Sequence, residues 1–370
     1  MSNTRQPSLV NIQLARGIAA ILVVAAHANL GAPAAFNGFF IPGWCGVDFF
    51  FVLSGFIIFY SSAKHLGHSE YLSSYFAKRF MRVFPIYWLY TGGAVLLLIA
   101  LREIGFTVYQ WVDLSPTGLI KTIVLWPSDV HSEIMPILPV AWTLSYEIAF
   151  YALFGVAIAF GKRVALLSAT VWVVAILAIG AQYTLPSGTL TKLLLDPRNI
   201  EFIFGCFAGY CAPKIASLDS GGKIAPNLFA AGSVLLAFSW ASAVAGYASS
   251  KFDAAVFGIP FFLIVLSLAV IDLRGQRSAN AWTKAGVFFG NASYSIYLIH
   301  FIPVALIAAA GTKFGLNPYA TFISASGIGL VLGCVGFVKL ELPLTRLLSM
   351  RHLNPTISTR SNPAQINMKA

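Results

Sequence analysis

The sequence predicts an all-α membrane protein that crosses the bilayer about ten times and keeps both termini in the cytoplasm. Of its 370 residues, 58% are hydrophobic and only 10% are charged, whereas soluble domains carry about 25% charged residues. The apolar residues form runs long enough to span a bilayer as helices. Lysine and arginine gather in alternate connections between these runs, as expected for loops on the cytoplasmic side.

Ten apolar segments of spanning length can be recognised. Their approximate boundaries are 9–30, 43–63, 84–101, 139–160, 163–181, 199–213, 226–246, 253–272, 286–310 and 320–340. Together they predict one membrane-embedded domain over residues 1–350. Residues 351–370 are polar and contain two Asn-Pro pairs, so we expect a disordered cytoplasmic tail.

The positive charges predict the orientation. With the amino terminus inside, seventeen of the 24 lysine and arginine residues fall on the inner side and six on the outer side, while Arg16 lies within the first segment. This asymmetry follows the positive-inside rule. It also accounts for the net charge of +11 without a nucleic-acid partner. The four cysteines have no zinc-ligand spacing, so no metal site is expected.

Two ionisable residues lie within the first apolar segment. Arg16 and His27 are eleven positions apart, which is about three helical turns, so both side chains should share one face about 16 Å apart. Between them on that face lie the small residues Ala19, Ala20 and Val23. Ionisable groups persist inside a membrane mainly where they line a functional cavity. The pattern therefore predicts a slot for a long, thin substrate with an anionic head.

Four further blocks hold most of the other unusual polar residues, at 46–56, 75–88, 141–151 and 290–300. They place Asp48 near the outer end of the second segment, and Arg79 and Arg82 at the inner mouth of the third. They also place Glu147 in the outer half of the fourth segment and His300 in the ninth.

With the first segment, these blocks resemble the acyltransferase 3 family, integral-membrane enzymes that acylate sugars of bacterial surface polysaccharides. The resemblance covers residues 9–345. It rests on Arg-Gly with His in the first segment, then Gly-Val-Asp-Phe-Phe-Phe-Val-Leu-Ser-Gly-Phe, Arg-x-x-Arg-x-x-Pro, Trp-x-Leu-Ser-x-Glu and Ser-Tyr-Ser-Ile-Tyr-Leu-x-His. Within the family, the sequence looks most similar to the exopolysaccharide acetyltransferases of rhizobia. The resemblance implies a multi-pass protein of the bacterial inner membrane and an acyl-coenzyme A donor, with no permanently bound cofactor.

The donor is expected at the inner mouth. Coenzyme A is cytosolic and carries several phosphates, which suit the planar guanidinium groups of Arg79 and Arg82. Arg16 would hold a phosphate or a pantetheine carbonyl further in. The alternative for the pair on the third segment is an ordinary positive-inside anchor.

His27 is expected to be the general base that takes the proton of the attacking sugar hydroxyl. The alternative is a histidine that only hydrogen-bonds between helices. Asp48 or Glu147 would orient His27 and stabilise its imidazolium, as an acidic residue does in hydrolase triads. For each carboxylate, a structural ion pair or a polar residue at a helix end is the competing interpretation.

Three further residues are expected to line the site: Ser145, Trp142 and His300. The sequence places no base beside Ser145, so direct transfer is a simpler prediction than an acyl-enzyme. His300 either faces the same cavity or is a satisfied core histidine.

The predicted function is transfer of an acetyl or similar short acyl group from acyl-coenzyme A to a sugar hydroxyl of a surface polysaccharide or its lipid-linked precursor. Partners would then include membrane lipid and polysaccharide-assembly proteins. The competing class is a transporter or flippase of lipid-linked sugars. Such proteins often contain internal repeats, and we find no similarity between the two halves of this chain.

Overall fold

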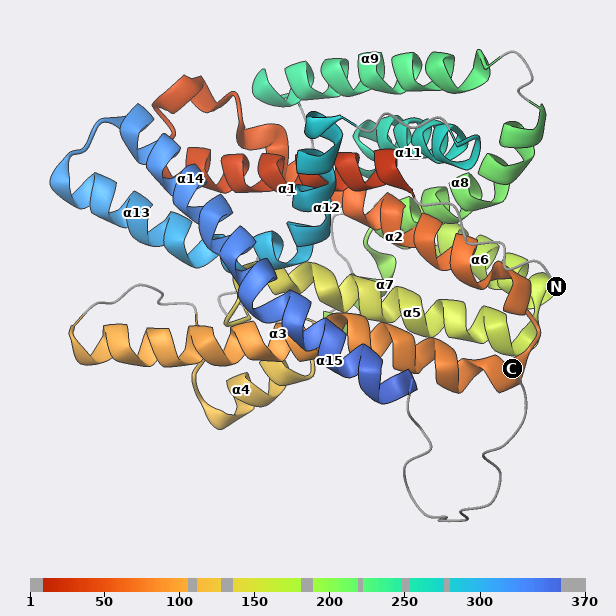
Figure 1. Cartoon of the computed structure of the whole chain (residues 1–370), viewed down its shortest axis with the longest axis horizontal. Coiled ribbons are helices and arrows are strands. Elements are labelled where there is room, and N and C mark those ends of the chain that lie inside the picture. Colours follow the sequence, from red (N-terminus) through yellow and green to blue (C-terminus); the bar gives the residue numbers. More distant parts are fainter. Residues whose placement is uncertain are drawn as a thin grey trace, which may run out of the picture.

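The computed structural model describes residues 9–105, 112–127, 136–180, 189–218, 222–247, 253–275 and 280–353. The regular elements in these ranges are helices (Figure 1). Eight helical stretches are long and apolar enough to cross a membrane, namely Val10–Gly31, Ile41–His65, Ser69–Glu103, Pro139–Phe160, Lys162–Ile179, Ile224–Val244, Ala254–Leu273 and Pro318–Leu348. The prediction of an all-α multi-pass membrane protein is confirmed, while the side on which the termini lie stays a prediction.

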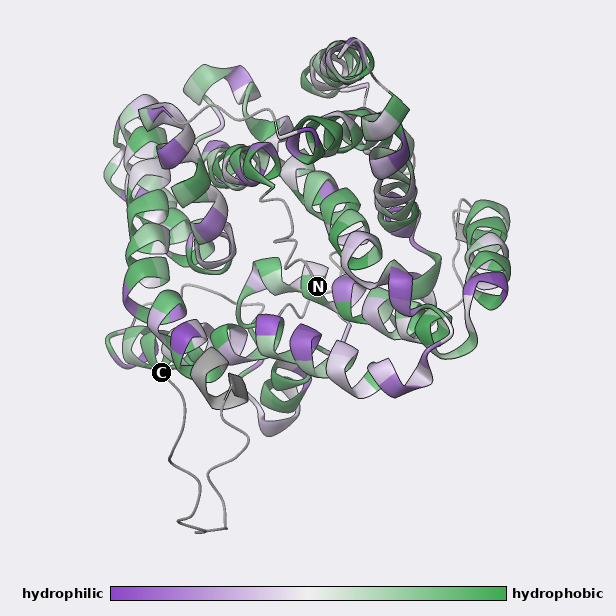
Figure 2. Cartoon of the chain, turned by 45° about the vertical axis from the view of Figure 1, so that its right-hand side comes forward, coloured by the Kyte–Doolittle hydropathy of each residue, from purple (hydrophilic) through white to green (hydrophobic). Residues whose placement is uncertain are grey.

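The long helices in these stretches are α1 (Val10–Gly31), α2 (Gly46–Ser62), α3 (Leu72–Glu103), α5 (Trp142–Phe160), α6 (Lys162–Ala175), α9 (Ile224–Val244), α11 (Gly258–Leu273) and α14 (Pro318–Gly336). Figure 2 shows that hydrophobic residues extend along all of the long helices. The stretches containing α6 and α9 are only 6% and 11% buried. Their apolar side chains therefore face outward, where lipid would cover them.

The predicted segment 286–310 is broken into α12 (Ala281–Ile299) and α13 (Phe301–Phe314), which meet at His300 with a bend of 58°. Pro303 explains the break. Its ring has no N–H and clashes with the carbonyl four residues earlier, that of Ile299. Counted as one span, the bent pair is the ninth candidate.

The segment 199–213 forms part of α8 (Asn199–Leu218), which packs against α2 and α11. This 20-residue helix is long enough to span a membrane but is not apolar enough to count among the candidates. At about 1.5 Å per residue it is nevertheless about 30 Å long, which matches the hydrocarbon core of a bilayer. If α8 crosses, the number of spans is ten and both termini return to one side.

Helix α3 begins twelve residues before the predicted start at 84, because Pro85 lies inside it without ending it. Its 32 residues make it about 48 Å long, which exceeds a bilayer core of about 30 Å. Arg79 and Arg82 are therefore on one helix, a single turn apart.

Helices α1 and α12 approach closely through glycines. A Cβ built at Gly290 would lie 2.0 Å from the backbone oxygen of Gln13, and one at Gly17 would lie 2.9 Å from Cβ of Phe289. Larger residues would push the two helices apart. This contact sets the distance between the polar residues that α1 and α12 carry.

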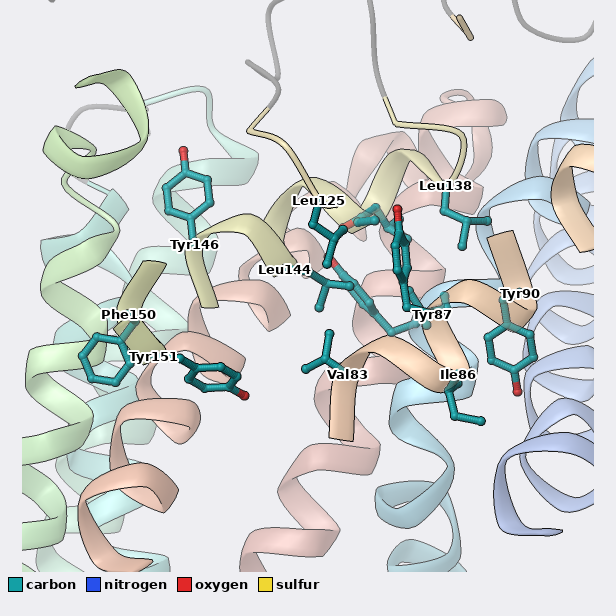
Figure 3. Close-up of a cluster of buried hydrophobic side chains, with 14 of the residues drawn as sticks. Val83, Ile86, Tyr87, Tyr90, Leu125, Leu138, Leu144, Tyr146, Phe150 and Tyr151 are labelled. Carbon is teal, nitrogen blue, oxygen red and sulfur yellow. The ribbon is translucent and has the colours of Figure 1, made fainter. Parts of the chain in front are cut away.

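A cluster of buried side chains joins α3 to α5 (Figure 3). Helix α3 contributes Val83, Ile86, Tyr87 and Tyr90, and α5 contributes Leu144, Tyr146, Phe150 and Tyr151. The short helix α4 (Pro116–Ile123) packs on α3, where the hydroxyl of Tyr87 donates to the carbonyl of Thr122 over 2.7 Å.

The remaining elements connect these helices. They are α7 (Thr189–Leu195), α10 (Asp253–Val256), α15 (Leu342–Leu353), short 3-10 turns, and two π-helical stretches, Ile176–Gly180 and Phe337–Glu341. Helix α15 reaches Leu353, past the predicted start of the tail at 351. Residues 354–370 lie outside the described part of the chain.

Candidate active site

A cavity of about 600 Å³, counting the part open to solvent, lies among α1, α2, α3, α5 and α12. Its lining combines charged groups with aromatic rings: Arg16, Val47, Phe50, Phe51, Ser54, Arg82, Val83, Thr143, Leu144, Glu147, Ser293, Tyr294 and Tyr297. Three of the predicted site residues, Arg16, Arg82 and Glu147, are brought together here.

Arg16 is held on the wall of the cavity by α1 and α12. Its guanidinium donates to Oε1 of Gln13 and to Oγ of Ser293, each over 2.9 Å, while its buried Nε has no hydrogen-bond partner. Arg16 also interacts electrostatically with Arg82, Glu341 and Glu147. The side chain is thus held in position by two of the five N–H donors of its guanidinium.

Arg82 lines the cavity from α3, and Arg79 lies one turn earlier. The guanidinium of Arg79 donates to Oγ of Ser61 over 2.9 Å and lies 5.5 Å and 5.7 Å from the ring centres of Tyr75 and Tyr151. These contacts hold Arg79 beside the cavity rather than on its wall. The two arginines predicted to act together have different surroundings.

Glu147 lines the same cavity as Arg16 and Arg82, whereas His27 does not line it. The sequence predicted that Glu147 or Asp48 would orient His27. Oε1 of Glu147 accepts hydrogen bonds from the hydroxyls of Tyr151 and Ser54, the latter over 3.2 Å. Glu147 is therefore a partner of the arginines.

Sequence reasoning missed Glu341. This residue ends the π-helical stretch Phe337–Glu341 and accepts a hydrogen bond from Oγ of Ser295, which in turn lies 2.6 Å from the hydroxyl of Tyr90. Its charge acts on both Arg16 and Arg82. Because it directly follows the apolar segment 320–340, the sequence alone suggested only a helix end. A π-bulge, which often occurs at functional sites, gives no signal in the pattern.

His27 and His300 form a pair beyond the cavity. Nε2 of His300 lies 3.2 Å from Nδ1 of His27, and their ring centres are 5.0 Å apart at 61°. Since Arg16 meets Ser293 and His27 meets His300, both α1 side chains face the α12 side. The shared face expected for Arg16 and His27 is present.

The smooth groove expected between them is absent from this face. Ala19, Ala20 and Val23 each expose at most 4% of their surface. A Cβ built at Gly46 would lie 2.5 Å from the carbonyl oxygen of Ala19. The cavity instead follows α2, α5 and α12. Tyr297 connects it to the histidines, because it lines the cavity and its ring centre lies 6.2 Å from that of His300.

Asp48 was expected to orient His27, yet it points toward α8. It is fully buried, as is Glu201 of α8, and the carboxyl groups of the two residues interact electrostatically. Two neighbouring buried carboxylates repel each other strongly unless one of them carries a proton. Neither residue lines the cavity. The structure thus favours a structural pair over a partner for His27.

Ser145 and Trp142 also lie off the cavity wall. Oγ of the buried Ser145 donates to the carbonyl of Leu125 over 2.9 Å, which fixes the turn after α4. The ring of Trp142 lies under the guanidinium of Arg198 at 5.4 Å and packs edge-on against Tyr146. These contacts give both residues a role in packing.

Known proteins identify the family of the chain. Residues 9–339 match the acyltransferase domain model of the acyltransferase 3 family. The chain belongs to the acyltransferase 3 family. It is also 29% identical over 334 residues, covering 87% of this chain and 96% of the relative, to the "Exopolysaccharide production protein ExoZ" of Rhizobium meliloti (strain 1021). No solved structure matches. The chain is therefore a multi-pass membrane acyltransferase.

Proposed function

We propose that this protein transfers an acetyl or similar short acyl group from cytosolic acyl-coenzyme A to a sugar hydroxyl of an exopolysaccharide or its lipid-linked precursor, in a bacterial inner membrane. Family membership supports the acyl transfer. The relative named as an exopolysaccharide production protein supports the acceptor class. The observation that carries the proposal is the arrangement of Arg16 and His27 along α12.

The arginines suit the anionic end of the donor. Arg16 and Arg82 face one cavity, and guanidinium groups bind phosphates through paired hydrogen bonds. Glu147 and Glu341 interact with these arginines and would balance their charge before the donor binds. Arg79, held beside Tyr75 and Tyr151, would meet the outer part of the coenzyme head.

His27 suits the reacting end. In the proposed reaction, the acceptor hydroxyl attacks the thioester carbonyl and its proton passes to the imidazole of His27. The new O–C ester bond forms, the C–S bond breaks, and His27 returns the proton to the departing coenzyme A thiolate. Atoms and charge balance without a further reactant or an acyl-enzyme.

The thioester must pass Tyr297 to reach His27. The hydroxyl of Tyr297 donates to the Val140 carbonyl and lies near Oγ1 of Thr143, each over 2.8 Å. These bonds hold the ring at the end of the cavity. In this account the ring turns aside when the acyl end of the donor enters.

The proposal is tested with purified protein in lipid nanodiscs, radiolabelled acetyl-coenzyme A and isolated exopolysaccharide. We expect label on the polysaccharide that is released by mild alkali, because an ester is alkali-labile. Label from succinyl-coenzyme A in a parallel assay shows how far the acyl group can vary. Movement of lipid-linked sugar across the bilayer without any thioester would favour the flippase instead.

A further inference from the structure

The polar neighbours of His27 determine which of its two ring nitrogens carries the hydrogen. Its Nδ1 is 2.9 Å from the carbonyl oxygen of Val23 and 3.2 Å from Nε2 of His300. The ring of Phe301 packs edge-on against it, with ring centres 5.2 Å apart at 82°. Among the described residues, no hydrogen bond reaches Nε2 of His27.

The direction of each hydrogen bond follows from the carbonyls. Nδ1 of His300 is 2.9 Å from the carbonyl of Ile296, and a carbonyl oxygen only accepts, so this nitrogen carries a hydrogen. His300 is completely buried, and an unpaired buried charge is costly. In the neutral ring, Nε2 of His300 therefore has a lone pair and accepts.

The tautomer of His27 also follows from its hydrogen-bond partners. Its Nδ1 faces two acceptors, the Val23 carbonyl and Nε2 of His300. The hydrogen consequently lies on Nδ1 and is shared between them, which leaves the lone pair of a neutral ring on Nε2. In the opposite tautomer, the lone pair of Nδ1 would face the lone pairs of the Val23 carbonyl oxygen and of Nε2 of His300. In functional imidazoles, the hydrogen bond made by one ring nitrogen usually determines the protonation of the other.

From these contacts we infer that His300 is a positioning residue that holds His27 as the Nδ1–H tautomer, with the Nε2 lone pair available for a proton. A neutral imidazole here does what a carboxylate does in hydrolase triads. The catalytic meaning rests on the proposed function, in which His27 is the base, whereas the tautomer itself does not. His300 makes this contact from the bend between α12 and α13.

Glutamine and methionine at position 300 provide a matched pair. Both side chains are similar in length and size, but only the amide oxygen of glutamine is a good acceptor at the place of Nε2. We expect His300→Gln to keep a kcat close to that of the wild type. His300→Met should lower kcat about tenfold, the effect of one hydrogen bond, without changing the KM for acetyl-coenzyme A. His68→Met, at a surface histidine paired with Glu70, is the control.

The tautomer is measured directly from the 15N chemical shifts of histidine-labelled protein in detergent, with the His27 signals assigned by their loss in His27→Ala. We expect a protonated Nδ1 and an unprotonated Nε2 in the wild type and in His300→Gln, and a mixture in His300→Met. A wild-type His27 pattern in folded His300→Met would overturn the inference, as would equal loss of kcat in the glutamine and methionine variants. Since the spectra need neither donor nor acceptor, they remain decisive if His27→Ala proves active and the proposed reaction fails.

Discussion

Arg16 of α1 and Arg82 of α3 face one cavity, and each interacts with the carboxylates of Glu147 and Glu341. Two guanidinium groups in a shared cavity repel each other unless an anion or a carboxylate lies nearby. Here the two carboxylates offset part of the positive charge of the arginines. An anionic donor would compete with them, so binding is expected to respond to each of these four groups.

Removal of Arg82 should weaken donor binding more than removal of Arg79, because Arg82 lines the cavity whereas Arg79 is held by Ser61 and two tyrosines. For Arg82→Ala we expect the Kd of acetyl-coenzyme A to rise about tenfold or more, as for the loss of a charged hydrogen bond. Arg82→Lys should recover only part of this, since an ammonium does not reproduce the planar fork. Titration calorimetry measures these values, with Lys78→Ala as the control, and an unchanged Kd in Arg82→Ala would remove it from the donor site.

Loss of Glu341 should disturb the same end of the site. Glu341→Gln keeps an acceptor for Ser295 but removes the charge that acts on Arg16 and Arg82. We therefore expect an altered donor Kd in Glu341→Gln, with the protein folded and its thermal unfolding near that of the wild type. If donor affinity and transfer rate both match the wild type, the residue belongs to the packing of α12 alone.

The pair formed by Asp48 and Glu201 predicts a stability effect without a large effect on chemistry. Asp48→Asn keeps a polar side chain of the same size beside Glu201, so transfer should fall by less than about threefold, within the range of one ordinary hydrogen bond. Asp48→Ala removes the polar neighbour of a buried carboxyl group and should destabilise the protein by about 1–3 kcal/mol. Thermal unfolding and transfer rates are measured together. A stable Asp48→Asn protein with transfer lost a hundredfold would restore Asp48 as the partner of His27.

Tyr297 should control passage from the cavity to the histidines. Tyr297→Phe removes the hydroxyl that bonds to Val140 and Thr143, which frees the ring, so donor binding and transfer should both persist. Tyr297→Trp fills the passage and should lower kcat about tenfold or more while the donor Kd changes little. If the tryptophan variant transfers at the wild-type rate, the acyl group takes another route.

The orientation of the protein in the membrane can be tested at two exposed lysines. In a background without native cysteines, we expect an impermeant thiol reagent to label Lys121→Cys in whole cells and to leave Lys64→Cys unlabelled. Both positions are exposed, so a difference reports the side of the membrane rather than burial. The reverse pattern would invert the predicted topology.

The parts that sequence predicted well depend on hydropathy and helical periodicity. The spanning helices and the common face of Arg16 and His27 follow from local patterns that packing did not change. The position of Glu147 beside the arginines and the partner of Asp48 depend instead on how helices distant in sequence pack. Glycines set that packing: a Cβ at Gly205 would lie 1.9 Å from the Val52 carbonyl, so α8 approaches α2 closely enough for Glu201 to meet Asp48. Pattern analysis cannot show such an approach in advance.

The most direct test of the account is the transfer rate of His27→Ala in nanodiscs, measured with donor affinity on the same preparation. We predict a folded protein that binds acetyl-coenzyme A normally, because the arginines lie at the other end of the site, but transfers the acyl group at least about a hundredfold more slowly. In the wild type, the rate should also fall as the solution is acidified, since only a neutral imidazole accepts a proton. A folded His27→Ala protein that acylates exopolysaccharide at the wild-type rate would contradict the account.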